Sequence, residues 1–242
     1  MFVVAGKEQD MIQFKKVQYE MDGKTILRDI SFSVQEGEFL SIIGHNGSGK
    51  TTLIKHINGL ILPTGGKVSV DGLDTKENGR EIRRKVGMVF QNPQDQLISS
   101  IVEDDVAFGL ENLSVAPIEI RMRVDRILHE LDITSLSKTN VNELSFGQKQ
   151  LVALAGIIVM EPSYIIFDEP FSWLDPRRKA ILKTIIQGLH RDGKTIILIT
   201  NDPLQDAGAE RTMILKEGRI LFDGKSKAVT SRLLKEALLA EA

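Results

Sequence analysis

The chain has 242 residues, and its 31 basic residues nearly balance its 33 acidic ones. This length is sufficient for one α/β domain with a full hydrophobic core, and the balanced charge argues against a nucleic-acid partner. The absence of cysteine excludes disulfides and thiolate metal sites.

Nothing in the sequence indicates a segment that enters a membrane. The longest apolar stretch, residues 151–160, is about half as long as a membrane-spanning helix requires. The first residues lack the basic and apolar segments of a signal peptide. We therefore expect a cytoplasmic protein that reaches a membrane only through its partners.

The first part of the chain predicts a small antiparallel sheet followed by a strand, a glycine-rich loop and a helix. Apolar residues alternate between residues 30 and 34, and a short apolar strand covers residues 39–43. The segment 44–51 then fits the phosphate-loop pattern G-x-x-x-x-G-K-[ST], and apolar residues recur at helical spacing between residues 53 and 60. This order predicts a site for the phosphates of a nucleotide.

The residue types in this loop suit phosphate binding. Its glycines allow backbone N–H groups to surround an anion, and the helix that follows directs its positive end toward the same anion. Lys50 is expected to reach the β- and γ-phosphates, and Thr51 to ligate Mg²⁺, whereas His45 is expected to be a spectator. The predicted ATP-binding residues are Gly44, His45, Asn46, Gly47, Ser48, Gly49, Lys50, Thr51 and Thr52.

Three further short strands are predicted over residues 86–90, 164–167 and 195–200, and each ends at a polar residue. These residues are Gln91, Asp168 and Asn201. Open α/β sheets bind their ligands at the carboxyl ends of such strands. The sequence therefore predicts that the three side chains, with Glu169 beside Asp168, lie at one edge of a sheet.

Residues 92–160 differ in character and predict a helical insert. Pro117 is typical of a first helical turn, and apolar residues recur at helical spacing from 120 to 131. Ser145 and Gln148 form a capping-box pattern at the start of another helix, and a helix start attracts anions. A short amphipathic helix is predicted for residues 231–242.

The phosphate loop, the run Leu144–Gln148 and the pair Asp168-Glu169, in this order and spacing, resemble the ATPase subunit of an ATP-binding cassette (ABC) transporter. The resemblance implies one α/β domain over residues 1–242. Its P-loop NTPase (RecA-like) core comprises residues 1–91 and 161–242, with an N-terminal antiparallel β subdomain, and residues 92–160 form the inserted α-helical subdomain. It also implies an ATPase that uses ATP and Mg²⁺.

The resemblance assigns a role to each polar residue at the predicted sheet edge. Glu169 matches the catalytic carboxylate that polarises the attacking water, and Gln91 matches a glutamine that touches both Mg²⁺ and that water. Asn201 stands where the family usually has histidine; an amide donates one hydrogen bond but carries no charge, so slow hydrolysis is expected. The predicted metal ligands are Thr51, Gln91 and Asp168.

A second group of residues is implied to act in trans, on the nucleotide of another ABC ATPase subunit that is either identical or paralogous. This signature segment consists of Ser145, Phe146, Gly147 and Gln148, with phenylalanine in place of the usual glycine. Asp175 matches an aspartate that faces the second subunit, and Trp173 nearby is expected to pack. Met21 replaces the aromatic residue that normally stacks on adenine, and Tyr19 lies two positions away on the same strand face.

Residues 90–97 and 102–109 resemble the energy-coupling-factor (ECF) subgroup, whose ATPases drive uptake of vitamins and of cobalt or nickel ions. This implies a peripheral protein at the cytoplasmic face of the cell membrane. A transmembrane scaffold subunit would dock near Gln91–Phe108, and a substrate-binding membrane subunit would be linked indirectly. Glu103, Asp104 and Asp105 are candidates for contacts with scaffold arginines.

Four alternatives remain open on the sequence. The three carboxylates could be only a solvated helix start. The chain could be the ATPase of another ABC importer branch, or an ATP-gated scaffold subunit with weak hydrolysis in an asymmetric dimer. A non-transport ABC protein is disfavoured, because the chain has neither a long coiled coil nor two tandem cassettes.

Overall fold

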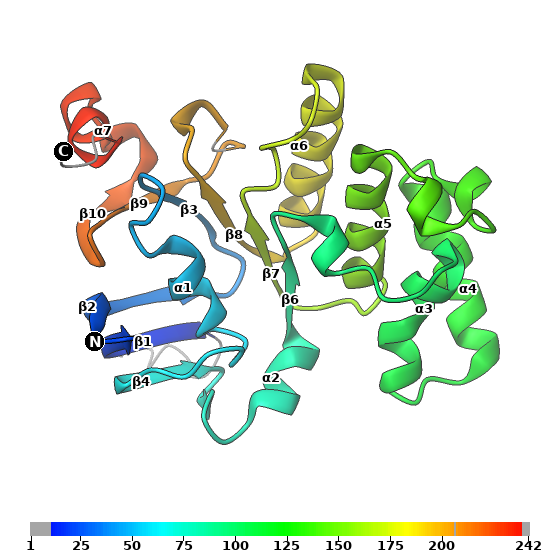
Figure 1. The fold of residues 1–242 in the computed structure, drawn as a ribbon, viewed down its shortest axis with the longest axis horizontal. Helices are drawn as coiled ribbons and strands as arrows, with labels where there is room; N and C mark the ends of the chain where they lie inside the picture. Colours follow the sequence, from blue (N-terminus) through cyan, green and yellow to red (C-terminus); the bar gives the residue numbers. More distant parts are fainter. Residues whose placement is uncertain (1–10, 206, 239–242) are drawn as a thin grey trace, which may run out of the picture.

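The computed structural model describes residues 11–205 and 207–238, which form two sheets with a group of helices at one side (Figure 1). An antiparallel sheet has the strand order β2-β1-β4-β5, and a six-stranded sheet has the order β10-β9-β3-β8-β7-β6. In the second sheet only β10 is antiparallel to its neighbour. The α/β fold with an antiparallel subdomain and a parallel core is therefore as predicted.

The elements have the following bounds. The strands are β1 (Met11–Met21), β2 (Lys24–Gln35), β3 (Phe39–Ile43), β4 (Gly65–Val70), β5 (Leu73–Asp74), β6 (Val86–Val89), β7 (Tyr164–Asp168), β8 (Thr195–Thr200), β9 (Arg211–Lys216) and β10 (Arg219–Lys225). The helices are α1 (Lys50–Lys55), α2 (Gly79–Lys85), α3 (Val102–Asn112), α4 (Pro117–Glu130), α5 (Phe146–Ile158), α6 (Pro176–Arg191) and α7 (Ser231–Leu238).

The central parallel strands are buried on both faces, so alternate residues enter two different cores. Along β7, Tyr164 and Ile166 pack with the antiparallel sheet and α1, whereas Ile165 and Phe167 pack toward α5 and α6. The strands of a sheet that is covered on both faces are nearly continuous apolar runs. These strands can therefore be predicted from the sequence. This layering fixes the carboxyl ends of β3, β7 and β8 beside one another.

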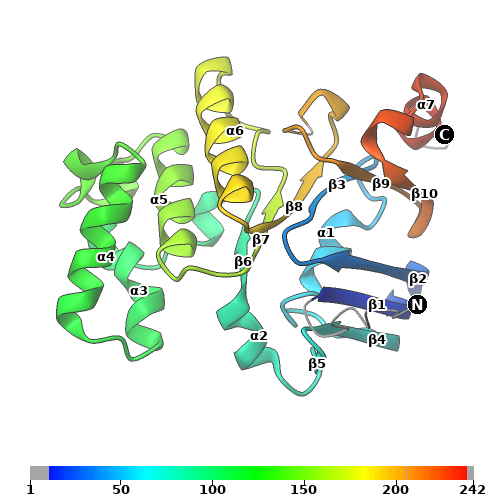
Figure 2. The same ribbon diagram turned by 180° about the vertical axis from the view of Figure 1, so that it is seen from behind.

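Within residues 92–160, for which the sequence predicts a helical insert, α3, α4 and α5 pack around an apolar cluster of their own (Figures 1 and 2). Pro117 occupies the first turn of α4, as predicted. Val124, Ile127 and Leu128 are buried in this cluster, so the predicted apolar face of α4 is confirmed. The insert carries the signature segment at the start of α5.

Two predicted helices differ in length from expectation. The helix after the phosphate loop ends at Lys55 instead of continuing to Leu60, which is 47% exposed. The chain turns away at Gly59, whose φ of +67° is incompatible with a continuing helix. The C-terminal helix is present to Leu238, and the rest of its predicted range lies outside the described residues. Across residues 11–205 and 207–238, no helix has both the length and the apolarity needed to span a bilayer.

Candidate active site

The phosphate loop runs from the carboxyl end of β3 into α1, and its glycines meet two different geometric demands. Gly47 and Gly49 have φ values of +85° and +103°, a region that side chains disfavour. Gly44 instead lies against β9, where a Cβ would overlap the carbonyl oxygen of Leu215. The loop therefore combines left-handed backbone with close strand contact, and left-handed backbone of this kind turns successive N–H groups toward one point, where they can bind an anion.

Lys50 folds back over the loop. Its Nζ donates hydrogen bonds to the carbonyl oxygens of Gly44 at 2.7 Å and His45 at 3.0 Å, and the side chain is only 5% exposed. The hydroxyl of Ser48 is buried and has no hydrogen-bond partner among the described residues. The backbone N–H of His45 donates to the carbonyl oxygen of Ala237 in α7, so the C-terminal helix braces the loop.

The carboxylate of Glu169 is the point on which the sheet-edge residues converge. Its Oε2 accepts hydrogen bonds from Gln91 Nε2 at 3.3 Å, Ser172 Oγ at 3.2 Å and Asn201 Nδ2 at 3.5 Å. Its Oε1 lies 3.7 Å from Lys50 Nζ. Glu169 has a φ of +45°, and strained backbone of this kind is typical of functional sites. The structure thus brings Gln91, Glu169 and Asn201 together at one edge of the sheet, as the strand ends predicted, and it places Lys50 beside them.

Asp168 and Thr51 form an oxygen-rich pair next to this carboxylate. Thr51 Oγ1 donates to Asp168 Oδ1 at 3.2 Å, and Asp168 is 4% exposed. Within the described chain no three His, Asp or Glu side chains are grouped as a metal site. A hydroxyl and one carboxylate are, however, the donors that suit Mg²⁺ when phosphate oxygens complete its coordination.

The charges of the site also favour an additional cation. Burial lowers the pKa of Lys50, although Glu169 and Asp168 both raise it. Burial raises the pKa of Asp168, a shift that the hydrogen bond from Thr51 opposes and the charge of Glu169 reinforces. Two carboxylates against one ammonium leave a net charge of −1 in a poorly solvated place. A divalent cation held by these carboxylates would change the local charge from −1 to +1, which suits an anionic ligand such as a phosphate chain.

A cavity of about 380 Å³ opens in front of these groups, and its volume is within the range of small-ligand sites. Gly44, His45 and Ser48, although in the loop, do not line it. Ile26, which the sequence analysis missed, does line it; an alternating apolar strand gives no signal that one member reaches a ligand. The lining residues are Ile26, Asn46, Gly47, Gly49, Lys50, Thr51, Thr52, Gln91 and Glu169.

Neither Met21 nor Tyr19 lines this cavity. Met21 ends β1 and is 52% exposed, whereas Tyr19 packs edge-on against His56 with ring centroids 5.0 Å apart. β1 contains register irregularities on both sides of Tyr19, so simple alternation does not relate the two side chains. Neither residue is therefore placed to stack on an adenine bound in this cavity.

The signature segment lies apart from the cavity, at the start of α5. Ser145 Oγ accepts from Gln148 N at 3.4 Å, and Gln148 Oε1 accepts from Ser145 N at 2.8 Å, so the predicted capping box is confirmed. The rings of Phe146 and Trp173 are 6.3 Å apart, but Trp173 remains 67% exposed. Asp175 caps α6 by accepting from Arg178 N at 3.0 Å. None of these residues lines the cavity at Lys50.

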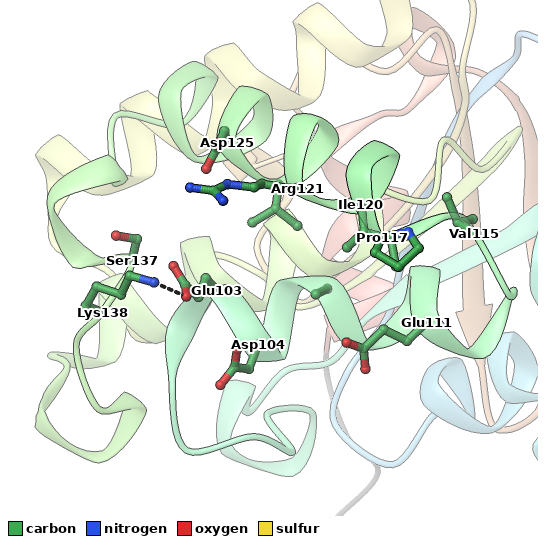
Figure 3. Close-up of a pocket in the computed structure, with 12 residues that line it drawn as sticks. Glu103, Asp104, Glu111, Val115, Pro117, Ile120, Arg121, Asp125, Ser137 and Lys138 are labelled. Atoms are coloured by element: carbon green, nitrogen blue, oxygen red, sulfur yellow. Dashed lines mark hydrogen bonds and ion pairs between the residues drawn. The ribbon is translucent and has the colours of Figure 1, made fainter.

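A groove of about 620 Å³ lies between α3 and α4 of the insert, with acidic residues along its rim (Figure 3). Glu103 is paired with Lys138, and Asp104 lies on the groove with no ion-pair partner among the described residues. Asp105 instead turns inward, where its Oδ1 accepts from the backbone N–H groups of Ile98 at 2.6 Å and Ser99 at 2.8 Å. The three consecutive carboxylates are thus not equivalent.

A P-loop fold with a buried lysine and paired carboxylates defines a protein that binds nucleoside triphosphates. A family model described as ABC transporter matches residues 27–172. The chain is 47% identical over 233 residues to the energy-coupling factor transporter ATP-binding protein EcfA1 of Clostridium perfringens (strain 13 / Type A), covering 95% of this chain and 83% of that protein. It is 44% identical over 216 residues to the cobalt import ATP-binding protein CbiO of Syntrophus aciditrophicus (strain SB), covering 88% and 77%.

A solved structure agrees with these relatives. The structure of CbiO1 from Clostridium perfringens, described as part of the ABC transporter complex CbiONQ, superposes with a TM-score of 0.81 at 34% identity, covering 95% of this chain and 94% of that one. The chain belongs to the ABC transporter family, as an ATP-binding ATPase subunit. The resemblance stated from the phosphate loop, signature segment and Asp168-Glu169 is therefore confirmed.

Proposed function

We propose that this chain is the ATP-hydrolysing motor subunit of an ECF-type ABC importer, in which ATP-driven closure of an ATPase dimer powers uptake of a vitamin or a transition-metal ion. The relatives named as energy-coupling-factor and cobalt-import proteins support this branch. The observation that carries the proposal is the convergence of Lys50, Gln91 and Asn201 on the carboxylate of Glu169.

In this proposal the phosphate loop holds the β- and γ-phosphates of ATP. Lys50 exchanges its bonds to the loop carbonyls for phosphate oxygens, which are stronger partners for an ammonium. Asn46, Thr52 and Ile26 line the remaining walls of the cavity.

Thr51, Asp168 and the side-chain oxygen of Gln91 would hold Mg²⁺ together with phosphate oxygens. When bound, this cation neutralises charge on the transferring phosphoryl group. Asp168 is held ready for it by the hydrogen bond from Thr51. Gln91 donates to Glu169 and directly precedes the helical insert in the chain. A movement of the insert would therefore move the Gln91 amide relative to the metal site.

Glu169 would orient the attacking water and accept its proton. Its Oε2 is oriented by hydrogen bonds from Gln91 and Ser172, while Oε1 accepts no hydrogen bond from the residues that donate to Oε2. Asn201 is the third donor, at 3.5 Å, and this long contact cannot supply the charge that a histidine would. We therefore expect slow hydrolysis at the site on this chain's own phosphate loop.

The signature segment would complete the site of a second ATPase subunit, identical or paralogous. Ser145 and Gly147 stand at the N-terminus of α5, whose free N–H groups favour an anion, and Asp175 lies at the start of α6 nearby. Because none of them lines the cavity at Lys50, they are available to a nucleotide held elsewhere.

The groove between α3 and α4 is the proposed docking place for a transmembrane scaffold subunit, through which a substrate-binding membrane subunit is linked. Of the three carboxylates at residues 103–105, Asp104 is the one that a scaffold arginine could pair with. Asp105 accepts hydrogen bonds from the chain's own backbone, so we do not propose it as a contact for the scaffold. The protein would thus be peripheral, at the cytoplasmic face of the cell membrane.

Glu169→Gln tests the motor function. Removing the base should lower the hydrolysis rate of the assembled dimer by about 10²–10⁴-fold while ATP binding persists. Glu130→Gln, on the exposed end of α4, is the matched control and should hydrolyse ATP at the natural rate. Unchanged hydrolysis in Glu169→Gln would exclude the assignment.

The alternative is an ATP-gated scaffold subunit with weak hydrolysis, and the long Asn201–Glu169 contact is the observation that favours it. Single-turnover hydrolysis by the natural chain and by Asn201→His in the assembled dimer distinguishes the two. A faster Asn201→His variant supports a slow but working site. Equal rates would contradict the idea that Asn201 limits hydrolysis.

A further inference from the structure

We propose that Arg178, on the first turn of α6, is a positioning residue that holds Ser145 and Asp175 in one fixed arrangement, so that both meet the second subunit's nucleotide together. This inference rests on the proposed function, because Ser145 acts only on a nucleotide held by another subunit. Nothing in the sequence singled out Arg178, since its partner Ser145 lies 33 residues away.

The guanidinium of Arg178 reaches the N-terminal ends of two helices at once. Its Nη2 donates to Ser145 Oγ at 3.4 Å, and its Nη1 lies 3.5 Å from Asp175 Oδ2. Ser145 caps α5 and Asp175 caps α6. The two helices lie side by side in both ribbon views (Figures 1 and 2), so this one side chain joins the two helix starts.

Glycine at position 147 makes room for this arrangement. A Cβ built on Gly147 would lie 2.5 Å from Arg178 Cδ and 2.8 Å from its Nε. The stem of Arg178 also lines a small, mainly apolar pocket between α5 and α6, together with Leu151 and Ile181. Packing of the stem and donation by the head thus occur in one conformation.

The hydrogen bonds at Ser145 give the arrangement a consequence for anion binding. Ser145 Oγ accepts from both Gln148 N and Arg178 Nη2, each at 3.4 Å. An arginine in a protein stays protonated and can only donate, so the hydroxyl proton of Ser145 is left to point away from both donors. An incoming anion is the acceptor that this outward O–H group fits. The positive charge of Arg178 beside it adds a second attraction.

Arginine is better suited to this role than lysine. The planar fork places one nitrogen on Ser145 and another on Asp175, whereas a single ammonium cannot keep both contacts with the same geometry. Lysine at 178 should therefore restore part of the function of a neutral variant by its charge. It should not restore all of it.

The test compares Arg178→Met, which keeps an unbranched stem without the charge, with Arg178→Lys and with the natural chain. In the assembled ATPase dimer, Arg178→Met should lower kcat/KM for ATP about 10-fold, the size of one charge-assisted hydrogen bond. Arg178→Lys should recover part of this loss. ATP binding to the isolated subunit should change less than twofold, because Arg178 does not line the cavity at Lys50. Arg177→Met, a change to the exposed neighbouring arginine, is the matched control.

Two further measurements separate positioning from general structure. Combining Arg178→Met with Ser145→Ala should cost clearly less than the sum of the two single losses, because part of the effect of Arg178 passes through that hydroxyl. Trp173, the only tryptophan, lies beside Phe146 and is exposed, so its fluorescence should change when a second subunit closes over this segment. Arg178→Met should shift this response to higher ATP concentration.

Either of two results would overturn the inference: natural kcat/KM in Arg178→Met, or losses that add to those of Ser145→Ala. If Arg178→Met keeps the natural kcat/KM for ATP while Ser145→Ala lowers it, only the inference about Arg178 fails. If Ser145→Ala itself hydrolyses ATP normally, the proposed trans role of the signature segment fails, and this inference fails with it.

Discussion

Alanine substitutions at the phosphate-loop glycines should separate the cost of a crowded position from the cost of a left-handed backbone. Gly44→Ala adds a Cβ 2.6 Å from Ser48 Oγ and closer still to the backbone oxygen of Leu215. That oxygen belongs to β9, which is held by β3 and β10 and cannot easily yield. Overpacking against fixed backbone costs about 3 kcal/mol, which lowers Tm by about 6–12 °C in a domain of this size.

Gly47→Ala meets a different obstacle. No atom lies within 4 Å of its added Cβ, but its φ is +85°. The left-handed conformation costs an alanine about 1–2 kcal/mol, or about 2–8 °C in Tm. Because the loop would relax away from this φ, one N–H group should leave the phosphate, and ATP affinity should fall about 10-fold or more.

Gly193 supplies a matched control, since its φ is +84° and its Cβ would also enter open space. It lies in the turn between α6 and β8, away from the residues that line the cavity. Gly193→Ala should lose as much stability as Gly47→Ala and should bind ATP normally. Thermal unfolding followed by circular dichroism, with calorimetric ATP titration, measures both effects.

Two outcomes would refute this reasoning. If Gly44→Ala is no less stable than Gly47→Ala, the contact with β9 is not rigid. If Gly193→Ala weakens ATP binding as much as Gly47→Ala does, the loss of affinity follows from lower stability and not from the geometry of the loop.

Three other perturbations test the packing around the site. Burial lowers the pKa of His56, so the unfolded chain takes up more proton at this residue than the folded protein does, and stability should fall as the pH drops below about 6.5. Urea unfolding between pH 7 and 5.5 should show a smaller fall for His56→Asn. Arg211 donates to both carboxylate oxygens of Asp223 at 2.6 Å, and with a side chain 24% exposed, Arg211→Lys should cost about 1–2 kcal/mol in unfolding free energy. Asp105→Ala removes the acceptor of two backbone N–H groups and should speed amide hydrogen exchange at residues 98 and 99. Asp104→Ala should leave this exchange unchanged. Equal exchange in the two variants would contradict the inward role of Asp105.

The parts of the fold that were predictable share a local physical cause. The strands ending at Asp168 and Thr200 are unbroken apolar runs because both faces of the sheet are covered, and the capping box at Ser145 depends on residues three apart. Polar residues after such strands meet at one edge, so the grouping around Glu169 followed from strand ends alone.

The parts that were not predictable depend on contacts between distant segments. Ile26 reaches the cavity because β2 passes the phosphate loop, and nothing in its neighbourhood in the sequence indicates this. Asp105 turns inward because two N–H groups of a loop need an acceptor, while Asp104 beside it faces the groove. Within a run of similar residues, tertiary hydrogen bonds decide which way each side chain points. Residue type alone does not predict that direction.

In the proposed function, Asn201 and Arg178 belong to different catalytic sites, and changes to the two residues should act independently. Asn201 touches the carboxylate of the site on its own phosphate loop, whereas Arg178 touches the segment proposed to serve the other subunit's site. In a dimer with a paralogue, Asn201→His should therefore quicken one site and Arg178→Met slow the other. In a dimer of identical chains both changes fall on the same two sites. Because the two contacts share no residue, their effects on the rate there should multiply.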